Sequence, residues 1–422
     1  MRFQWLIIWA FVCWQLVYLY AQEVSHCGEE QGRKEDLKSG RVSETDRQFE
    51  EWINSSEIRR KQVVIEGTIR LPVVIHVIHN GEQVGTGTNI SQAQILSQLQ
   101  ALNLDFSALN PDLANVPEDF RKISGSLPVI FELAATDPDG NPSNGIVRVQ
   151  GTKTSYLRAE HPLVKALSYW PAEKYINIWV CNITDYYGYT QFPISELPGI
   201  ENAVTNRLTD GILVNYRTFG STAFGNFNLI PTLNKGRILT HEMGHYFGLR
   251  HIWGDVLDCS GTDYVDDTPK QSSDTMGCPA GPIQDCEGTR MYQNYMDYTA
   301  DACMGLFTRQ QAERMLIVLT NSPRRVTLIP QFQEVLTDIP VLFSPNGDGI
   351  NDYWIWPDTD AYADCVLVMY DRTGREVYRM KGYDNSWNGR SHSGAQLEEE
   401  AYYYEIKCDG RKNISGGVRI VR

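Results

Sequence analysis

The sequence predicts an α+β fold in which a larger domain of strands and helices is followed by a small all-β sandwich. Three observations lead to this prediction. β-branched apolar runs alternate with an amphipathic helix in the first half, a second helix carries regularly spaced histidines, and short strand-like runs alternate with Gly-rich turns near the C-terminus.

Length and charge narrow the functional classes. The chain has 422 residues, of which 42% are apolar and 11% aromatic, which is enough for two or three domains with buried cores. A scaffold held together by disulfides alone is therefore excluded. The formal net charge of -14 argues against a sequence-independent grip on phosphates, so we expect no nucleic acid partner.

The first residues predict export. Residues 5–20 are apolar or aromatic except for one glutamine, and polar sequence follows Ala21, which is typical of a signal peptide over 1–21. This stretch is short for a membrane span of roughly 20 residues, although an uncleaved anchor is the alternative. Of nine cysteines only Cys13 lies within it, so eight remain in the exported chain and disulfides are expected. After processing we expect no stable transmembrane segment.

Residues 22–61 are polar and charged and predict a removable pro-segment. Within it, a short amphipathic pattern surrounds Phe49, Trp52 and Ile53. The basic cluster at residues 59–61 would be a cutting point for activation, with a solvated linker as the alternative reading. The larger domain would then span 62–330 and the small one 338–422.

The larger domain begins with a buried strand at 71–78, because most residues of that run are β-branched. A helix follows, in which Ser91 and Gln94 have capping-box spacing and four apolar residues recur on one face: Ile95, Leu99, Leu102 and Phe106. Further strands are expected at 127–133, 146–149 and 175–180.

The character of the sequence changes after about residue 330. Strand-like runs at 365–370, 401–407 and 418–421 alternate with turn clusters such as 344–349, which is typical of a small β-sandwich. Cys365 and Cys408 lie on separate runs and could form a disulfide. The turn around Asp348 resembles a calcium loop faintly, but a Gly-rich turn explains it better.

The residues that carry chemistry lie between 241 and 251, where the sequence fits HExxHxxGxxH. Residues four apart share one helix face, so His241 and His245 can bind one metal ion. Gly248 would end the helix by taking a left-handed conformation, and the turn would return His251 as a third ligand. Three imidazoles leave one zinc position open, which is typical of a catalytic zinc site. Glu242, beside them, would act as general base on a water and then protonate the leaving amine.

At these residues the chain resembles the metzincin metalloproteases, and among them the pappalysin and cytophagalysin family. The segment 294–298 is similar to the family's Met-turn, and the stretches 258–269 and 301–308 are similar to the sequences of family members. The resemblance covers about residues 71–319. It implies a metzincin-like catalytic domain with a mixed twisted sheet, helices including the active-site helix, and an irregular lower subdomain. It also places Met296 beneath the metal and implies that Tyr298 stabilises the oxyanion of the reaction.

Four cysteines follow the third histidine, and the sequence by itself leaves their three pairings open. Without CxxC spacing, a second zinc site is disfavoured. The resemblance implies disulfides Cys259–Cys286 and Cys278–Cys303. It also suggests structural calcium in the acidic loop, which a merely solvated loop would explain equally well; the candidate ligands are Asp255, Asp258, Asp263, Asp266 and Asp267.

Cys27 lies in the predicted pro-segment. A thiolate binds zinc strongly, and family members carry a pro-segment cysteine that fills the open metal position, so Cys27 could keep the enzyme latent. The alternative is a disulfide with Cys181, which has no evident local partner.

The last segment resembles the gliding-motility-associated C-terminal domain, a sorting signal for type IX secretion. The resemblance lies in the stretches 343–352, 369–374 and 387–389 and in the closing strand. It implies passage across both membranes of a Gram-negative cell, a secreted or surface-bound protein, and the type IX machinery as a partner.

Together these features predict a secreted zinc-dependent endopeptidase that is made as a zymogen and acts on polypeptides of extracellular proteins. Kinship with the family suggests cleavage beside Arg or Lys. One alternative is an inactive cell-surface binding protein with a metalloprotease fold, which the intact Glu242 disfavours. Another is an amidase of small peptides, which would need a narrow pocket.

Overall fold

The computed structural model describes residues 24–28, 43–55, 67–193, 207–286, 288–329, 339–356, 359–408 and 413–422. The predicted signal peptide and the basic cluster at 59–61 lie outside these residues. Within them, no helix combines the length and the apolar character that crossing a bilayer requires.

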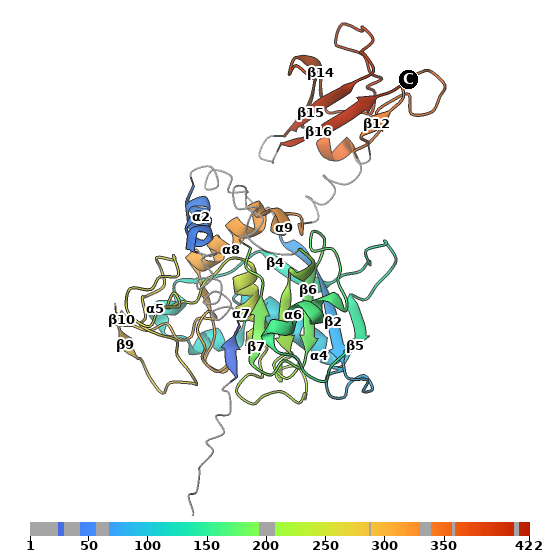
Figure 1. Ribbon diagram of the computed structural model, residues 1–422. Coiled ribbons are helices and arrows are strands. Elements are labelled where there is room, and N and C mark those ends of the chain that lie inside the picture. Colours follow the sequence, from blue (N-terminus) through green and yellow to red (C-terminus); the bar gives the residue numbers. More distant parts are fainter. Residues whose placement is uncertain are drawn as a thin grey trace, which may run out of the picture.

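The described part of the larger unit is built on a seven-stranded sheet with the order β1-β7-β8-β6-β2-β4, in which β5 also pairs with β2 (Figure 1). Strand β7 runs antiparallel to β8, β1 runs parallel to β7, and the other neighbours are parallel. The bounds are β1 Ser25–Cys27, β2 Ile69–His79, β4 Val129–Leu133, β5 Ile146–Gln150, β6 Ile176–Cys181, β7 Tyr186–Thr190 and β8 Ile212–Asn215.

Strand β2 pairs with three strands, with β4 and β5 on one side and β6 on the other. Both of its faces are buried, which explains its nearly unbroken apolar sequence. Val73 and Ile75 belong to the main core, which includes residues of helices α4 and α7. Ile78 belongs to a second cluster with Val164 of α6.

The helices of the larger unit are α2 Ser43–Asn54, α4 Gln92–Phe106, α5 Glu118–Arg121, α6 His161–Ala166, α7 Arg237–Tyr246, α8 Arg309–Asn321 and α9 Pro323–Val326. Short 3-10 segments cover η1 Pro111–Asn115, η2 Arg158–Glu160 and η3 Arg207–Thr209. The predicted helix at 91–106 is therefore α4. Ser91 caps it by accepting the backbone N–H of Gln94 at 3.1 Å. No capping box is formed at this helix start, and the Gln94 amide nitrogen donates to the carbonyls of Tyr216 and Phe219.

The lower part of this unit is irregular, as predicted. The described residues between α7 and α8 hold only two-residue strands, β9 Gln284–Asp285, β10 Gly288–Thr289 and β11 Phe307–Thr308, the last of which pairs with β3 Ser124–Gly125. Two disulfides, Cys259–Cys286 and Cys278–Cys303, cross-link this region in the pairing that the family resemblance implies. Loops of this length add roughly 3 to 4 kcal/mol each by the chain-entropy account.

The C-terminal unit is β-rich, with a five-stranded sheet in the order β12-β16-β15-β13-β14. Its core combines strand residues with Trp354, Trp356 and Trp387, which come from connecting segments. The described residues of this unit form this one sheet, whereas the predicted sandwich would have two. Side chains from the connecting segments complete the core in place of a second sheet. A disulfide joins Cys365 to Cys408. The elements are β12 Leu342–Phe343, η4 Thr359–Tyr362, β13 Val366–Tyr370, β14 Glu376–Lys381, β15 Ala401–Lys407 and β16 Ile414–Ile420.

The turn around Asp348 is organised by a neighbouring carboxylate. Asp352 accepts the backbone N–H groups of Gly347 and Gly349 at 2.6 and 2.8 Å. These hydrogen bonds agree with a Gly-rich turn. The α+β class and the separate β-rich C-terminal unit are thus confirmed.

Candidate metal centre

Helix α7 lies in the core against the sheet, and all ten of its residues are buried. His241 and His245 are one turn apart on it, so their imidazoles project from the same face. The helix ends at Tyr246, and Gly248 follows with a φ of 85°. This left-handed conformation, which glycine adopts without a Cβ penalty, turns the chain so that His251 comes back to the other two histidines.

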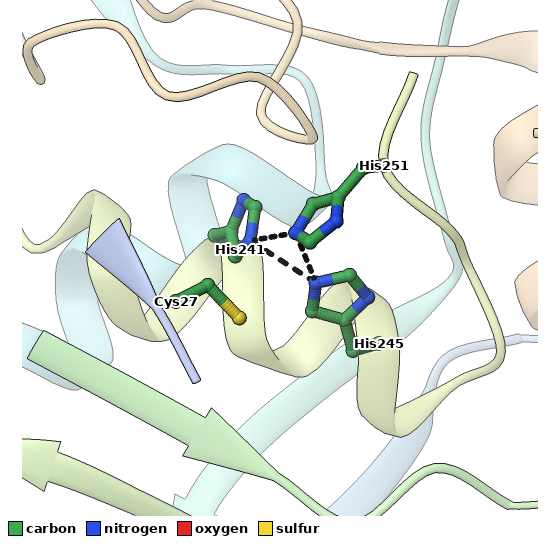
Figure 2. A group of neighbouring side chains, drawn as sticks. All are labelled: Cys27, His241, His245 and His251. Atoms are coloured by element: carbon green, nitrogen blue, oxygen red, sulfur yellow. Dashed lines mark hydrogen bonds between the residues drawn. The ribbon is translucent and has the colours of Figure 1, made fainter. Parts of the chain in front are cut away.

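The three Nε2 atoms converge on one point (Figure 2). The Nε2 of His245 lies 3.1 Å from that of His241 and 3.1 Å from that of His251, and the remaining pair is 3.3 Å apart. A tetrahedral zinc ion with bonds of about 2.0–2.1 Å holds its nitrogen ligands about 3.3 Å apart. The spacing of the three imidazoles therefore fits a zinc ion.

The other ring nitrogens determine where the protons are. The Nδ1 of His241 faces the carbonyl of Tyr295 at 2.7 Å, and the Nδ1 of His245 faces that of Leu249 at 2.8 Å. A nitrogen next to a carbonyl oxygen must carry the hydrogen, which assigns the proton to Nδ1 and leaves a lone pair on Nε2.

His251 follows the same rule, with a carboxylate as its acceptor. Its Nδ1 lies 2.5 Å from Oδ1 of Asp255. All three Nε2 lone pairs therefore point at one another, which is repulsive unless a cation lies between them. Metal-binding histidines characteristically donate their second ring N–H in this way.

The protonation state also suits metal binding. Burial lowers the pKa of His241 well below its ordinary value, and the neighbouring His245 and His251 lower it further. A neutral imidazole at neutral pH can donate its lone pair to a metal. His26 lies in the same buried space, with its ring centroid 4.9 Å from that of Tyr298, and burial lowers its pKa to about 3.

The predicted Met-turn lies directly beneath the histidines. Met296 is fully buried, and a Cβ on Gly244 would lie 2.5 Å from its sulfur, so a side chain at this position would have to displace the methionine. The Tyr298 hydroxyl lies 3.1 Å from Nε2 of His251. Asp297 fixes the backbone of the turn by accepting the N–H groups of Thr275 and Tyr298.

Glu242 is buried beside strand β7. A Cβ on Gly188 of that strand would lie 2.6 Å from both Cγ and Oε1 of Glu242. Gly188 therefore provides the space that this carboxylate occupies. Gly188 could not be recognised from the sequence, since no local pattern shows which strand residue faces the helix.

Cys27 comes to the same point from β1. It pairs with Gly188 of β7, and its sulfur belongs to a group with the three histidines whose ligand atoms all lie within 4.8 Å of one another (Figure 2). The alternative disulfide with Cys181 is wrong in this structure, because Cys181 is a buried free thiol.

The acidic loop is arranged differently from a carboxylate cage. Asp255 accepts from His251, and buried Asp263 accepts the Thr268 hydroxyl at 2.9 and 3.0 Å. Among the described residues, only two groups of three or more His, Cys, Asp or Glu side chains could hold a metal, and neither includes Asp258, Asp263, Asp266 or Asp267. Calcium in this loop stays a prediction.

Asp105 is a second supporting residue that could not be recognised from the sequence. Its carboxylate accepts from Arg237 at 2.8 Å, from the Thr240 hydroxyl at 2.7 Å and from the Tyr295 hydroxyl at 2.9 Å. It thereby joins α4, the start of α7 and the Met-turn. Its position near the end of an amphipathic helix gave no sign of this role. The contact of Asp255 with His251, by contrast, could have been predicted from their spacing of four residues.

A helix and a following turn that gather three imidazoles, with a carboxylate beside them on a mixed sheet, define the class of this protein as a metallopeptidase. The comparisons with known proteins agree. The profile described as Pregnancy-associated plasma protein-A matches residues 163–320, and the type IX secretion signal domain matches residues 337–420. The chain belongs to the Pregnancy-associated plasma protein-A (pappalysin) family of peptidases, and it is a secreted or cell-surface protein.

Relatives of known structure extend this likeness. A Tannerella forsythia promirolysin mutant is 37% identical, with a TM-score of 0.61 over 73% of this chain and 98% of that chain. Mature mirolysin from the same organism, in complex with a cleaved peptide, is 40% identical, with a TM-score of 0.57 over 65% of this chain and all of that chain. An extracellular metalloprotease of Colletotrichum graminicola is 30% identical over 252 residues, which are 59% of this chain and 75% of that protein.

Proposed function

We propose that this protein is a zinc-dependent endopeptidase of the metzincin type, exported as a latent zymogen and acting on extracellular polypeptides. The observation that carries the proposal is the convergence of three imidazole lone pairs, 3.1 to 3.3 Å apart, beside a buried glutamate. Zinc bound there would polarise the scissile carbonyl and make a water nucleophilic at neutral pH.

The chain's own residues would move the proton and bind the developing charge. Glu242 would take a proton from the attacking water and deliver it to the leaving amine. The Tyr298 hydroxyl, next to Nε2 of His251, would donate a hydrogen bond to the oxygen that becomes negative. His241, His245 and His251 would hold the ion, with their orientation fixed by Tyr295, Leu249 and Asp255.

Glu242→Ala tests this assignment. We expect hydrolysis of casein to fall at least about a hundredfold, because proton transfer is lost, while the zinc content is unchanged, because no ligand is removed. Activity is measured after removal of the pro-segment, and metal by elemental analysis. Glu313→Ala on α8 is the matched control, since that glutamate is exposed and on another helix. Equal casein cleavage by the Glu242 variant would refute the role.

Latency is proposed to come from Cys27. Its sulfur could occupy the metal position that a water needs, and the similar promirolysin is named as a pro-form. The accompanying strand β1 lies along β7, next to Glu242, and so covers the site.

Cys27→Ser should raise the activity of the uncleaved chain, because a hydroxyl binds zinc far more weakly than a thiolate. The measurement is the initial rate on a quenched peptide, with the chain length checked on a gel. Cys181→Ala is the control, since Cys181 is also a buried thiol but lies outside the metal-binding group. A Cys27 variant as latent as the control would count against the thiolate plug.

Substrates are proposed to be polypeptides with a preference for sites beside Arg or Lys. The structure of mature mirolysin in complex with a cleaved peptide supports a peptide substrate. The net charge of -14 favours the approach of basic segments. A peptide library incubated with the activated protein, with and without a chelator, would show the preference. No cleavage in either condition would favour the alternative, an inactive surface binding protein.

A further inference from the structure

Helix α2 of the predicted pro-segment is attached to the catalytic unit by a buried ionic contact. Glu50 accepts from Arg250 at 2.9 Å and from two nitrogens of Arg314 at 2.7 and 2.8 Å. The three side chains are only 8%, 2% and 5% exposed. Two guanidinium groups held together away from water need an anion, and Glu50 supplies it.

Apolar packing accompanies the ionic contact. Phe49 is fully buried and clusters with Ile53, Phe192 and Val318. Its ring lies 5.1 Å from that of Phe192, centroid to centroid. Phe49 therefore occupies an apolar slot on the catalytic unit, and the adjacent Glu50 binds a pair of arginines there.

These contacts lie on the turn that carries the third histidine. Arg314 donates its Nε to the carbonyl of Gly248 at 2.8 Å, and a Cβ on Gly248 would lie 3.1 Å from the Phe49 ring. Arg250 directly precedes His251 in the sequence. None of the residues in the α2 contact belongs to the group that could bind the metal.

We propose that Arg250 and Arg314, with the slot formed by Phe192 and Val318, are a binding site for a helix that carries a carboxylate next to an aromatic residue, and that α2 is its ligand. The site holds the pro-segment independently of the metal and of Cys27. It rests on the proposed function only in treating residues 22–61 as removable.

The test measures retention of the pro-segment after a cut. The full chain is nicked with trypsin at the basic cluster at 59–61, a chelator is added to remove any contribution of the metal, and the fragment is followed by size exclusion and mass spectrometry. We expect the wild-type fragment to elute with the catalytic unit. Glu50→Gln should weaken its retention at least about tenfold, because charge-assisted hydrogen bonds to two arginines are lost.

Glu51→Gln is the matched control, because the neighbouring glutamate on the same helix is exposed. Amide hydrogen exchange of the uncut chain verifies the fold: the amides of α2 should exchange faster in Glu50→Gln, while those of β2 and β6 should not change. Phe49→Leu tests the apolar half without removing a charge and should also weaken retention.

Retention of the Glu50→Gln fragment equal to that of Glu51→Gln, or loss of the wild-type fragment as soon as the chelator is added, would overturn the proposal. Neither readout depends on catalysis. If the chain had no peptidase activity, the proposed function would be refuted, but the retention measurement would still test the binding site for α2.

Discussion

Some residues at the metal centre are required for the chemistry of their side chains, and others for the space that a small residue leaves. Gly188 illustrates the second, because its missing side chain is the volume that Glu242 fills. Gly244 does the same for Met296 on the other side of the helix. Both glycines allow neighbouring elements to approach closely, and neither is needed for backbone flexibility.

Gly188→Ala should lower the turnover rate at least about tenfold, because its Cβ would displace the carboxylate from its position beside the metal centre. Zinc content should not change, and alanine is acceptable in a strand. Gly281→Ala is the control, because a Cβ there meets no atom within 4 Å and the backbone needs no left-handed conformation. The rates are measured on a quenched peptide; equal rates for the two variants would show that Glu242 tolerates the displacement.

The histidines could be predicted from the sequence because helix periodicity and one glycine turn bring them together within eleven residues. Gly188 and Asp105 could not, since each acts on α7 from an element more than fifty residues away. Asp255 was assigned only to the acidic loop, although its distance of four residues from His251 places it within reach of that ring.

At the scale of elements, most of the apolar strands and the helix α4 were predicted, whereas β1, β7 and the 13-residue helix α8 were not. The strands β2, β4, β5, β6, β13 and β15 and the helix α4 appear close to their expected positions. The strand β7 was missed because its sequence, Tyr-Tyr-Gly-Tyr-Thr, contains a glycine and lacks an aliphatic residue. The three residues of β1 have no pattern to detect, since only the edge of β7 makes them a strand.

Asp105→Asn should destabilise the protein by about 3 kcal/mol, because the buried Arg237 would lose the nearer of its two carboxylate partners while α4, α7 and the Met-turn lose a shared contact. Urea unfolding measures this loss. Asp119→Asn is the control, since that side chain is 94% exposed and its contact with Lys122 is a surface ion pair. A loss no larger than that of the control would show that Asp105 does not hold these elements together.

At the scale of the whole molecule, two hydrophobic cores share no residue, one built on the mixed sheet and one on the C-terminal sheet. A domain with its own core can fold alone. The change of sequence character after residue 330 anticipated this division, because strand length and turn spacing are local properties.

Deletion of residues 338–422 should therefore leave peptide hydrolysis by the refolded chain unchanged but stop its release from the cell, because the segment that matches the secretion signal is gone. Fractionation of cells that express the two chains measures the location, and a quenched peptide measures the activity. Normal release of the shortened chain, or loss of hydrolysis after refolding, would contradict this separation.

The pairing of β1 with β7 has a kinetic consequence. Ser25 and Cys27 are in register with Tyr186 and Gly188, so they use the backbone groups that any extended peptide lying along β7 would need. An extended peptide that paired with β7 could therefore not bind while β1 occupies the same backbone groups. On the proposed zymogen scheme, a substrate that pairs with β7 would compete with the cleaved segment for that strand, so a high substrate concentration would hinder rebinding of the segment.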